Sequence, residues 1–200
     1  MKIRLEEKND YYVNENLTRE AFWNVYQPGC YEHYILHKIR NDKSYVKELS
    51  YVIEEKGKLV ASIVYAKGKV TNGKDEKEIL LFGPVSVLPE YQGAGYGSKL
   101  IKYTLKLAKK MGYPAVIITG KPEFYNKLGF KPASKFNIYY KGLENTENPY
   151  LMIKVLNRRK IKSIYGVYSE PSVYLVNKEE VEEFDKKFPY KKKIKKEEQL

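Results

Sequence analysis

The sequence predicts an α/β protein with α+β-like element order: a mixed, mostly antiparallel sheet with helices on both faces. Three consecutive apolar segments joined by turn signals are typical of antiparallel strands. One strand–helix–strand unit then follows, which is typical of a single parallel pair. The chain has 200 residues, of which 42% are apolar and 31% charged, a balance that suits a globular core and excludes a collagen or a membrane protein.

Apolar spacing and turn residues define the elements in chain order. The first part is expected to begin with a strand over 2–5, a helix over 18–26 that Thr18 caps and Pro28-Gly29 stops, and a second helix over 31–40. A hairpin of 49–54 and 59–65, a loop over 67–78 and a strand over 79–88 bent at Gly83-Pro84 are expected to follow. The second part is expected to contain a Gly-rich turn over 89–98, an amphipathic helix ended by Gly112, a strand over 115–119, a helix over 122–128 ended by Gly129, and a hairpin of 136–140 and 150–156. Asn177, with Glu180 three positions later, predicts a capped helix to about residue 187.

Charge and cysteine content exclude several classes. The net charge of +12 comes from 37 basic and 25 acidic residues, and only five of the basic residues are Arg. Residues 186–200 alone hold seven Lys and two Glu. The remaining positive charge is spread over the rest of the chain, and this diffuse distribution disfavours nucleic-acid binding. The single cysteine, Cys30, excludes a disulfide framework and a Cys-based zinc site, and no metal is expected. No apolar signal or membrane span is visible, which favours a cytoplasmic protein without membrane contact.

The segment from Val85 to Ser98 carries the chemistry. An apolar strand ends, three glycines alternate at Gly93, Gly95 and Gly97, and a helix begins. Free N–H groups and the positive helix end make such a turn an anion site suited to a pyrophosphate. No Lys follows the last glycine, as a P-loop requires, and no acidic residue follows at the Rossmann spacing, so both nucleotide motifs match weakly.

Two motifs resemble those of the GCN5-related N-acetyltransferases, the GNAT family. Residues 92–97, QGAGYG, match the Q/R-x-x-G-x-G/A pattern of that family, and residues 123–130, EFYNKLGF, are similar to its FYxKLGF segment. The element order also agrees, and the resemblance covers about residues 2–140. It implies a GNAT domain over 1–156. Residues 157–200 are then a C-terminal extension, packed on the same domain, with a short helix and a Lys-rich tail, as in one uncharacterised bacterial subgroup.

The resemblance implies acetyl-CoA as the donor and an amine as the acceptor. It also implies that the two parallel strands splay apart at their C-terminal ends. The pantetheine arm of CoA would then bind the backbone in the gap between these strands, and the turn amides would hold the pyrophosphate. The cofactor-binding residues implied in this way are Val85, Ser86, Val87, Gln92, Gly93, Ala94, Gly95, Tyr96, Gly97 and Ser98. Tyr125 corresponds to the family's general acid for the leaving thiolate, and Cys30 has no catalytic role.

The general base is not identified by the residues. Many relatives carry a Glu on the strand before the glycine turn, whereas residues 79–87 contain no carboxylate. Glu123, Glu32, His33 and a backbone–water chain stay open. The predicted function is transfer of acetyl from acetyl-CoA to a primary amine by direct attack in a ternary complex. The alternatives are a degenerate fold that binds CoA as a sensor or scaffold, and a basic nucleic-acid-binding module. Acceptor identity and homodimerisation are left open.

Overall fold

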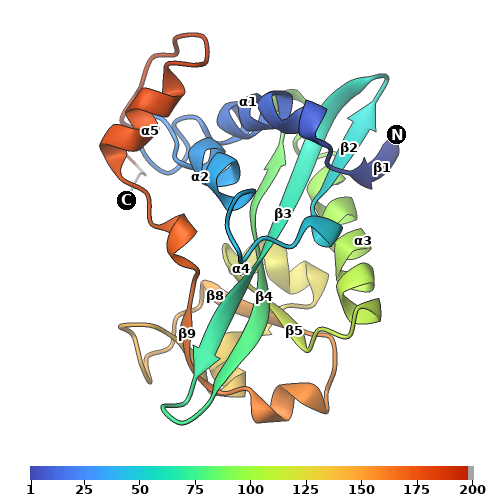
Figure 1. Cartoon of the computed structure of the whole chain (residues 1–200), viewed down its shortest axis with the longest axis vertical. Coiled ribbons are helices and arrows are strands. Elements are labelled where there is room, and N and C mark those ends of the chain that lie inside the picture. Colours follow the sequence, from blue (N-terminus) through green and yellow to red (C-terminus); the bar gives the residue numbers. More distant parts are fainter. Residues whose placement is uncertain (198–200) are drawn as a thin grey trace. The chain divides into compact units, whose positions relative to one another are not determined.

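The structure, a computed structural model of the chain, describes residues 1–197 and shows nine strands and five α-helices within that range (Figure 1). The strands are β1 (Lys2–Leu5), β2 (Tyr51–Glu55), β3 (Lys58–Thr71), β4 (Glu76–Val87), β5 (Ala115–Thr119), β6 (Lys131–Pro132), β7 (Ile138–Tyr140), β8 (Leu151–Val155) and β9 (Gly166–Ser169). The helices are α1 (Tyr11–Phe22), α2 (Glu32–Ile39), α3 (Tyr96–Lys110), α4 (Pro122–Tyr125) and α5 (Lys178–Asp185).

The chain divides into two compact units. The first contains Met1–Val64, Pro84–Leu100 and the residues from Ser172 onward, and the second contains Tyr65–Gly83 and Ile101–Pro171. β3, β4 and α3 each contribute residues to both units. The predicted division at residue 156 stays a prediction, and the last three residues of the predicted extension lie outside the described range.

The first unit contains the antiparallel strands that the sequence predicts. β1 pairs with β2, and β2 pairs with β3. Lys56 and Gly57 form the turn between β2 and β3 with φ values of 50° and 79°. Two successive left-handed residues are typical of the hairpin turn that matches strand twist. The predicted strand at 2–5 and the predicted hairpin are therefore confirmed.

The helix predicted over residues 18–26 is wrong at both ends. α1 begins at Tyr11 and ends at Phe22, so Thr18 lies in the helix interior instead of capping it. Thr18 is fully buried, and its hydroxyl oxygen lies 2.9 Å from Ser86 Oγ. The turn after α1 is organised by Asn24, whose side-chain oxygen accepts a hydrogen bond from the Gly29 N–H at 2.8 Å. The Thr18 side chain, which suits a helix N-cap, therefore forms a buried contact with Ser86 instead.

The loop predicted over residues 67–78 is also wrong, because it is mostly strand. β3 continues to Thr71 and β4 begins at Glu76. Ion pairs join the two strands, from Lys67 Nζ to Glu78 Oε2 at 3.2 Å and from Lys69 Nζ to Glu76 Oε1 at 2.6 Å. The polar residues that resemble a loop are the outward side chains of a strand pair.

The second unit holds the parallel pair. Its strand order is β3-β4-β5-β8-β6, and β9 pairs with both β3 and β7. β4 and β5 are parallel through Leu80 with Val116 and Leu81 with Ile117, as the strand–helix–strand unit predicts. β8 lies between β5 and β6 and is antiparallel to both.

The predicted hairpin of 136–140 and 150–156 is wrong, although both segments are strands. β7 pairs in parallel with β9, and β8 pairs with β5. The apolar side chains of β8 instead join a core built from several strands and two short helical turns. That core contains Val70, Ile79, Ala115, Ile117, Ala133, Ile138, Leu151, Ile153, Ile161, Ile164 and Tyr168.

α5 is confirmed as a capped helix and packs in the first unit, where Figure 1 shows it in red beside α2. The Asn177 side chain accepts a hydrogen bond from the Glu179 N–H at 2.7 Å. Arg19 of α1 donates two hydrogen bonds to Asp185 of α5, at 2.6 and 3.1 Å. These contacts anchor the helix of the extension to α1.

The sheet confirms the predicted fold class, mixed α/β and mostly antiparallel. The β7–β9 contact adds a second parallel pair. Within residues 1–197, no helix combines the length and the hydropathy that a bilayer span requires.

Candidate functional site

The carboxyl end of β4 leads into the candidate site in the first unit. Side chains alternate there: Val85 and Val87 are half-buried, whereas Ser86 is buried and bonded to Thr18. The Gln92 side-chain amide donates a hydrogen bond to the Val87 carbonyl at 3.1 Å. This bond ties the end of β4 to the start of the glycine turn.

Gly93 and Gly95 give the turn its shape. Their φ values are 78° and 83°, in the left-handed region that favours glycine. Apart from the adjoining residues of the chain, no atom lies within 4 Å of the position where a Cβ would stand on either residue. The space over the turn is therefore open, although side chains larger than hydrogen would strain the backbone.

The amides of this turn are free to bind a ligand. Within residues 1–197, no protein acceptor takes a hydrogen bond from the N–H groups of residues 93–98, and the first bond of α3 runs from Lys99 N–H to the Gly95 carbonyl at 3.0 Å. Residues 92–95 are exposed and residues 96–98 are half-buried. Unpaired donors at the positive end of a fifteen-residue helix favour an anion with several oxygens, such as a pyrophosphate.

The remaining turn residues support this arrangement. A Cβ on Gly97 would stand 3.5 Å from Val87 Cγ2, so the start of α3 lies close to the end of β4. The Tyr96 hydroxyl donates to Glu55 Oε2 at 3.4 Å, and its ring meets Tyr91 edge-on at 5.7 Å. Ala94 and Ser98 contribute main-chain groups to the same turn, and all seven predicted residues from Gln92 to Ser98 lie on one continuous surface segment.

Tyr125 lies in the second unit, at the end of α4. It is 7% exposed, and its ring packs against Phe82, Phe124 and Phe130 at centroid distances of 6.1, 5.0 and 5.5 Å. The ring also covers Gly120, where any Cβ would collide with it. An aromatic cage of this kind holds the phenol ring in one orientation, as a positioned proton donor requires.

Among the candidate bases, His33 has the least access to solvent. It is fully buried, its Nδ1 lies 3.3 Å from Cys30 Sγ, and its Nε2 lies 3.1 Å from Asp185 Oδ1. Burial lowers the pKa of His33 to about 4. Its position indicates a structural role for this side chain in the first unit.

Two carboxylates, Glu32 and Glu123, stay candidates. Glu32 opens α2, accepts a hydrogen bond from the Tyr31 N–H at 2.9 Å, and has its pKa raised by burial. Glu123 is exposed in the first turn of α4. The general base therefore stays open between these two carboxylates and a backbone–water chain.

Two residues that contact neighbours of the candidate site, Thr18 and Tyr65, were not identified from the sequence. Thr18 holds Ser86 in place through its hydroxyl. In the second unit, Tyr65 is fully buried, packs on Phe82 at 5.4 Å, and lies 2.9 Å from Thr104 through its hydroxyl. Tyr65 is one of 20 tyrosines and carries no local motif, so nothing in the sequence distinguishes it.

No cluster of three or more His, Cys, Asp or Glu side chains in residues 1–197 is arranged to hold a metal ion.

Comparison with known proteins defines the class. Residues 47–132 match the acetyltransferase (GNAT) domain. Over these residues the chain is similar to the acetyltransferases of the GNAT family. It is similar to the uncharacterized N-acetyltransferase YjhQ of Escherichia coli (strain K12), with 28% identity over 100 residues. That match covers 50% of this chain and 55% of YjhQ, so the chain spans about half the length of this curated relative.

Solved structures share the fold over most of the chain. The GNAT family N-acetyltransferase YhbS from Escherichia coli, in complex with CoA, has a TM-score of 0.75 and 19% identity, covering 88% of this chain and 92% of that one. A GNAT family acetyltransferase from Brucella melitensis, in complex with acetyl-CoA, has a TM-score of 0.69 and 25% identity, covering 86% and 97%.

Proposed function

We propose that the protein transfers acetyl from acetyl-CoA to a primary amine by direct attack in a ternary complex. One observation carries this proposal: the N–H groups from Gly93 to Ser98 donate to no acceptor within residues 1–197. These amides bind the CoA pyrophosphate, with the Gln92 side chain fixing the entry to the turn. The two solved relatives described above are complexes with CoA and acetyl-CoA, which supports the same donor here.

Main-chain groups of Val85, Ser86 and Val87 bind the pantetheine arm in this proposal. β4 continues to Val87, beyond the Leu80 and Leu81 pairs that join it to β5. The Val87 N–H polarises the thioester carbonyl, because a preorganised donor stabilises the oxygen on which negative charge develops. The hydrogen bond between the Thr18 and Ser86 hydroxyls holds the Ser86 side chain at this strand end.

Tyr125 donates a proton to the departing CoA thiolate. A phenol of pKa near 10 and a thiol near 8.5 are close enough in acidity to share a proton. The neutral amine nitrogen attacks the thioester carbon, the C–S bond breaks, and the thiolate takes the Tyr125 proton and leaves as CoA-SH. The proton lost by the attacking nitrogen passes to the base, and protonation through water returns Tyr125 to its phenol form. Cys30 takes no part as a nucleophile, since it is buried and burial raises its pKa, which keeps it a thiol.

A CoA-binding sensor or scaffold is the second candidate function. It is favoured by the absence of a carboxylate from β4 between Ile79 and Val87. The resemblance to the GNAT family implies a Glu on this strand in many relatives. Such a protein would bind acetyl-CoA in the same turn without turning it over.

A two-part measurement separates these functions. Calorimetry measures acetyl-CoA binding, and a thiol reagent measures CoA release against a panel of primary amines. The transferase function predicts binding and amine-dependent thiol release. Binding with no release across the panel supports the sensor, and absence of binding removes both.

A further inference from the structure

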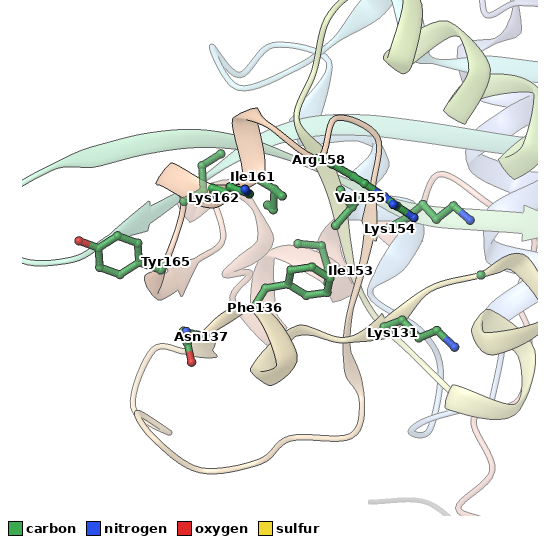
Figure 2. Close-up of a pocket in the computed structure, with 12 residues that line it drawn as sticks. Lys131, Phe136, Asn137, Ile153, Lys154, Val155, Arg158, Ile161, Lys162 and Tyr165 are labelled. Atoms are coloured by element: carbon green, nitrogen blue, oxygen red, sulfur yellow. The ribbon is translucent and has the colours of Figure 1, made fainter.

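A cavity of about 600 Å³ lies in the second unit, built from residues that take no part in the proposed acetyl transfer. β6, β8 and the short helical turns Ala133–Phe136 and Lys160–Ser163 supply most of its lining. Its volume falls within the usual range of small-molecule sites, about 300–1,000 Å³. Figure 2 shows the residues that line it.

The charged lining is entirely basic. Lys131, Lys154, Arg158 and Lys162 border the cavity, and no Asp or Glu is among its twelve lining residues. None of the four cations forms an ion pair with a carboxylate of residues 1–197. Lys154 is held in place by one hydrogen bond, from Nζ to the Leu128 carbonyl at 3.0 Å, and keeps further donors.

Three of these cations gather at one side of the cavity. Lys131 pairs with Ile153 across β6 and β8, and Lys131, Lys154 and Arg158 all line the cavity. In Figure 2, the nitrogen ends of Lys131, Lys154 and Arg158 lie to the right of the Phe136 ring, and Tyr165 lies to its left. Clustered like charges repel one another, so a bound anion would relieve the repulsion.

The floor of the cavity is apolar. Ile153 and Ile161 are buried in the core of the second unit, and Phe136 packs against that core while bordering the cavity. Val155 adds a half-buried aliphatic surface. An aromatic ring or short alkyl chain on this floor would lose its contact with water, which favours binding.

We propose that this cavity is an accessory binding site for a small organic anion with an apolar body, such as an aromatic carboxylate or sulfonate. The anionic group binds the basic side formed by Lys131, Lys154 and Arg158. The apolar body lies on Phe136 and Ile153. A concave site with an aromatic floor fits a small molecule better than a flat acidic protein surface.

The probe for the experiment is 8-anilinonaphthalene-1-sulfonate, an aromatic sulfonate whose fluorescence rises in apolar sites. Titrations use the full chain with saturating CoA present, which keeps the proposed donor site occupied. We expect saturable binding at one site per chain that weakens as salt is raised, because exposed charges are screened. If the probe binds without CoA but not in its presence, the signal belongs to the donor site, and the proposal is overturned.

Matched variants test the charge. Arg158→Glu with Lys162→Glu reverses two exposed cations of the cavity, and is expected to weaken probe binding about tenfold. Lys74→Glu with Lys77→Glu reverses two exposed cations at the β3–β4 turn, with the same change in net charge. The control is expected to bind like the unchanged chain, and equal weakening in both variants would contradict a specific site.

A neutral analogue tests the anionic requirement. N-phenyl-1-naphthylamine keeps the aromatic rings and lacks the sulfonate. It is expected to bind at least tenfold more weakly than the sulfonate and to be insensitive to the charge reversals. If the two probes bind with equal affinity, the anionic group contributes nothing to binding, and the proposal is wrong.

Discussion

Gly95 combines a backbone conformation with an open surface, and both matter for the proposed donor site. Its φ of 83° costs a residue with a side chain about 1–2 kcal/mol, which a folded domain tolerates. Gly95→Glu would place a carboxylate over the free amides and repel a diphosphate. We expect acetyl-CoA affinity to fall roughly a hundredfold, measured by calorimetry.

The matched control is Gly73→Glu. Gly73 has a φ of 88°, and no atom lies within 4 Å of its Cβ position, so the backbone strain is comparable. Its affinity for acetyl-CoA should be unchanged. If both variants bind normally, the glycine turn is not the pyrophosphate site.

Tyr125 is held by aromatic neighbours, so its hydroxyl can be removed with little change in packing. Tyr125→Phe is expected to lower kcat about a hundredfold and to change acetyl-CoA affinity less than twofold, since a general acid acts on the leaving group. Tyr150→Phe, at a tyrosine that is 54% exposed, serves as the control. Equal kcat values for Tyr125→Phe and the unchanged enzyme would remove the acid role.

His33 couples folding of the first unit to pH. Burial is the main cause of its lowered pKa of about 4; Arg19 and Lys193 lower it further, and Asp185 partly opposes them. Cys30 and the rings of Phe184 and Phe188 also face it. The ordinary pKa is about 6.5. Between these values the unfolded chain binds a proton that the folded chain does not, so stability falls as pH drops from about 6.5 to 4, by on the order of 3 kcal/mol.

Two measurements check this pH dependence. The imidazole resonances of His33 should titrate near pH 4 in the folded protein. Urea unfolding should show a shallower loss of stability between pH 6.5 and 4 in His33→Asn than in the unchanged chain. A folded-state titration near 6.5 would contradict the prediction.

At the scale of elements, the ion pair between Arg19 and Asp185 stabilises the packing of α5 on α1. The Arg19 side chain is 1% exposed, and Asp185 binds it through both carboxylate oxygens. Asp185→Asn leaves the buried guanidinium with only the more distant Glu20 carboxylate, 4.0 Å from Arg19 Nη1, and is expected to destabilise the first unit by about 3 kcal/mol in urea unfolding. Glu183→Gln, on the exposed face of α5, is the control and should change little. A wild-type midpoint for Asp185→Asn would mean that the pair contributes nothing to docking.

The elements also show what the sequence can predict. The glycine turn, α3 and β5 follow local rules, because positive-φ glycines and apolar periodicity act within a few residues. The start of α1 was mispredicted because Thr18 bonds to Ser86, 68 positions away. The β3–β4 extension was missed because its charged side chains pair across strands, and β7 found its partner in β9 instead of β8. Long-range pairing of this kind leaves no local signal.

The candidate site divides in the same way. Residues 92–98 were singled out by their glycine spacing and by the resemblance of 92–97 to a family motif, and their role in binding the donor stays a prediction. The burial of His33 depends on Asp185, Phe184 and Phe188 from the distant α5 segment, so the sequence could not separate this histidine from the other base candidates. Sequence identifies binding by main-chain groups more readily than catalysis by side chains brought together in folding.

For the molecule as a whole, the net charge of +12 should assist an anionic donor. The field of exposed lysines extends about 10 Å at 0.1 M salt and about 3 Å at 1 M. Acetyl-CoA affinity is therefore expected to fall several-fold between these concentrations, whereas pantetheine, which lacks the phosphates, should bind with little salt dependence. Calorimetry across a salt series measures both. If salt lowers the affinities of acetyl-CoA and pantetheine equally, the net charge does not act on the phosphates, and the prediction is wrong. If salt leaves the affinity for acetyl-CoA unchanged, the neutral amides of the glycine turn are the whole source of phosphate affinity.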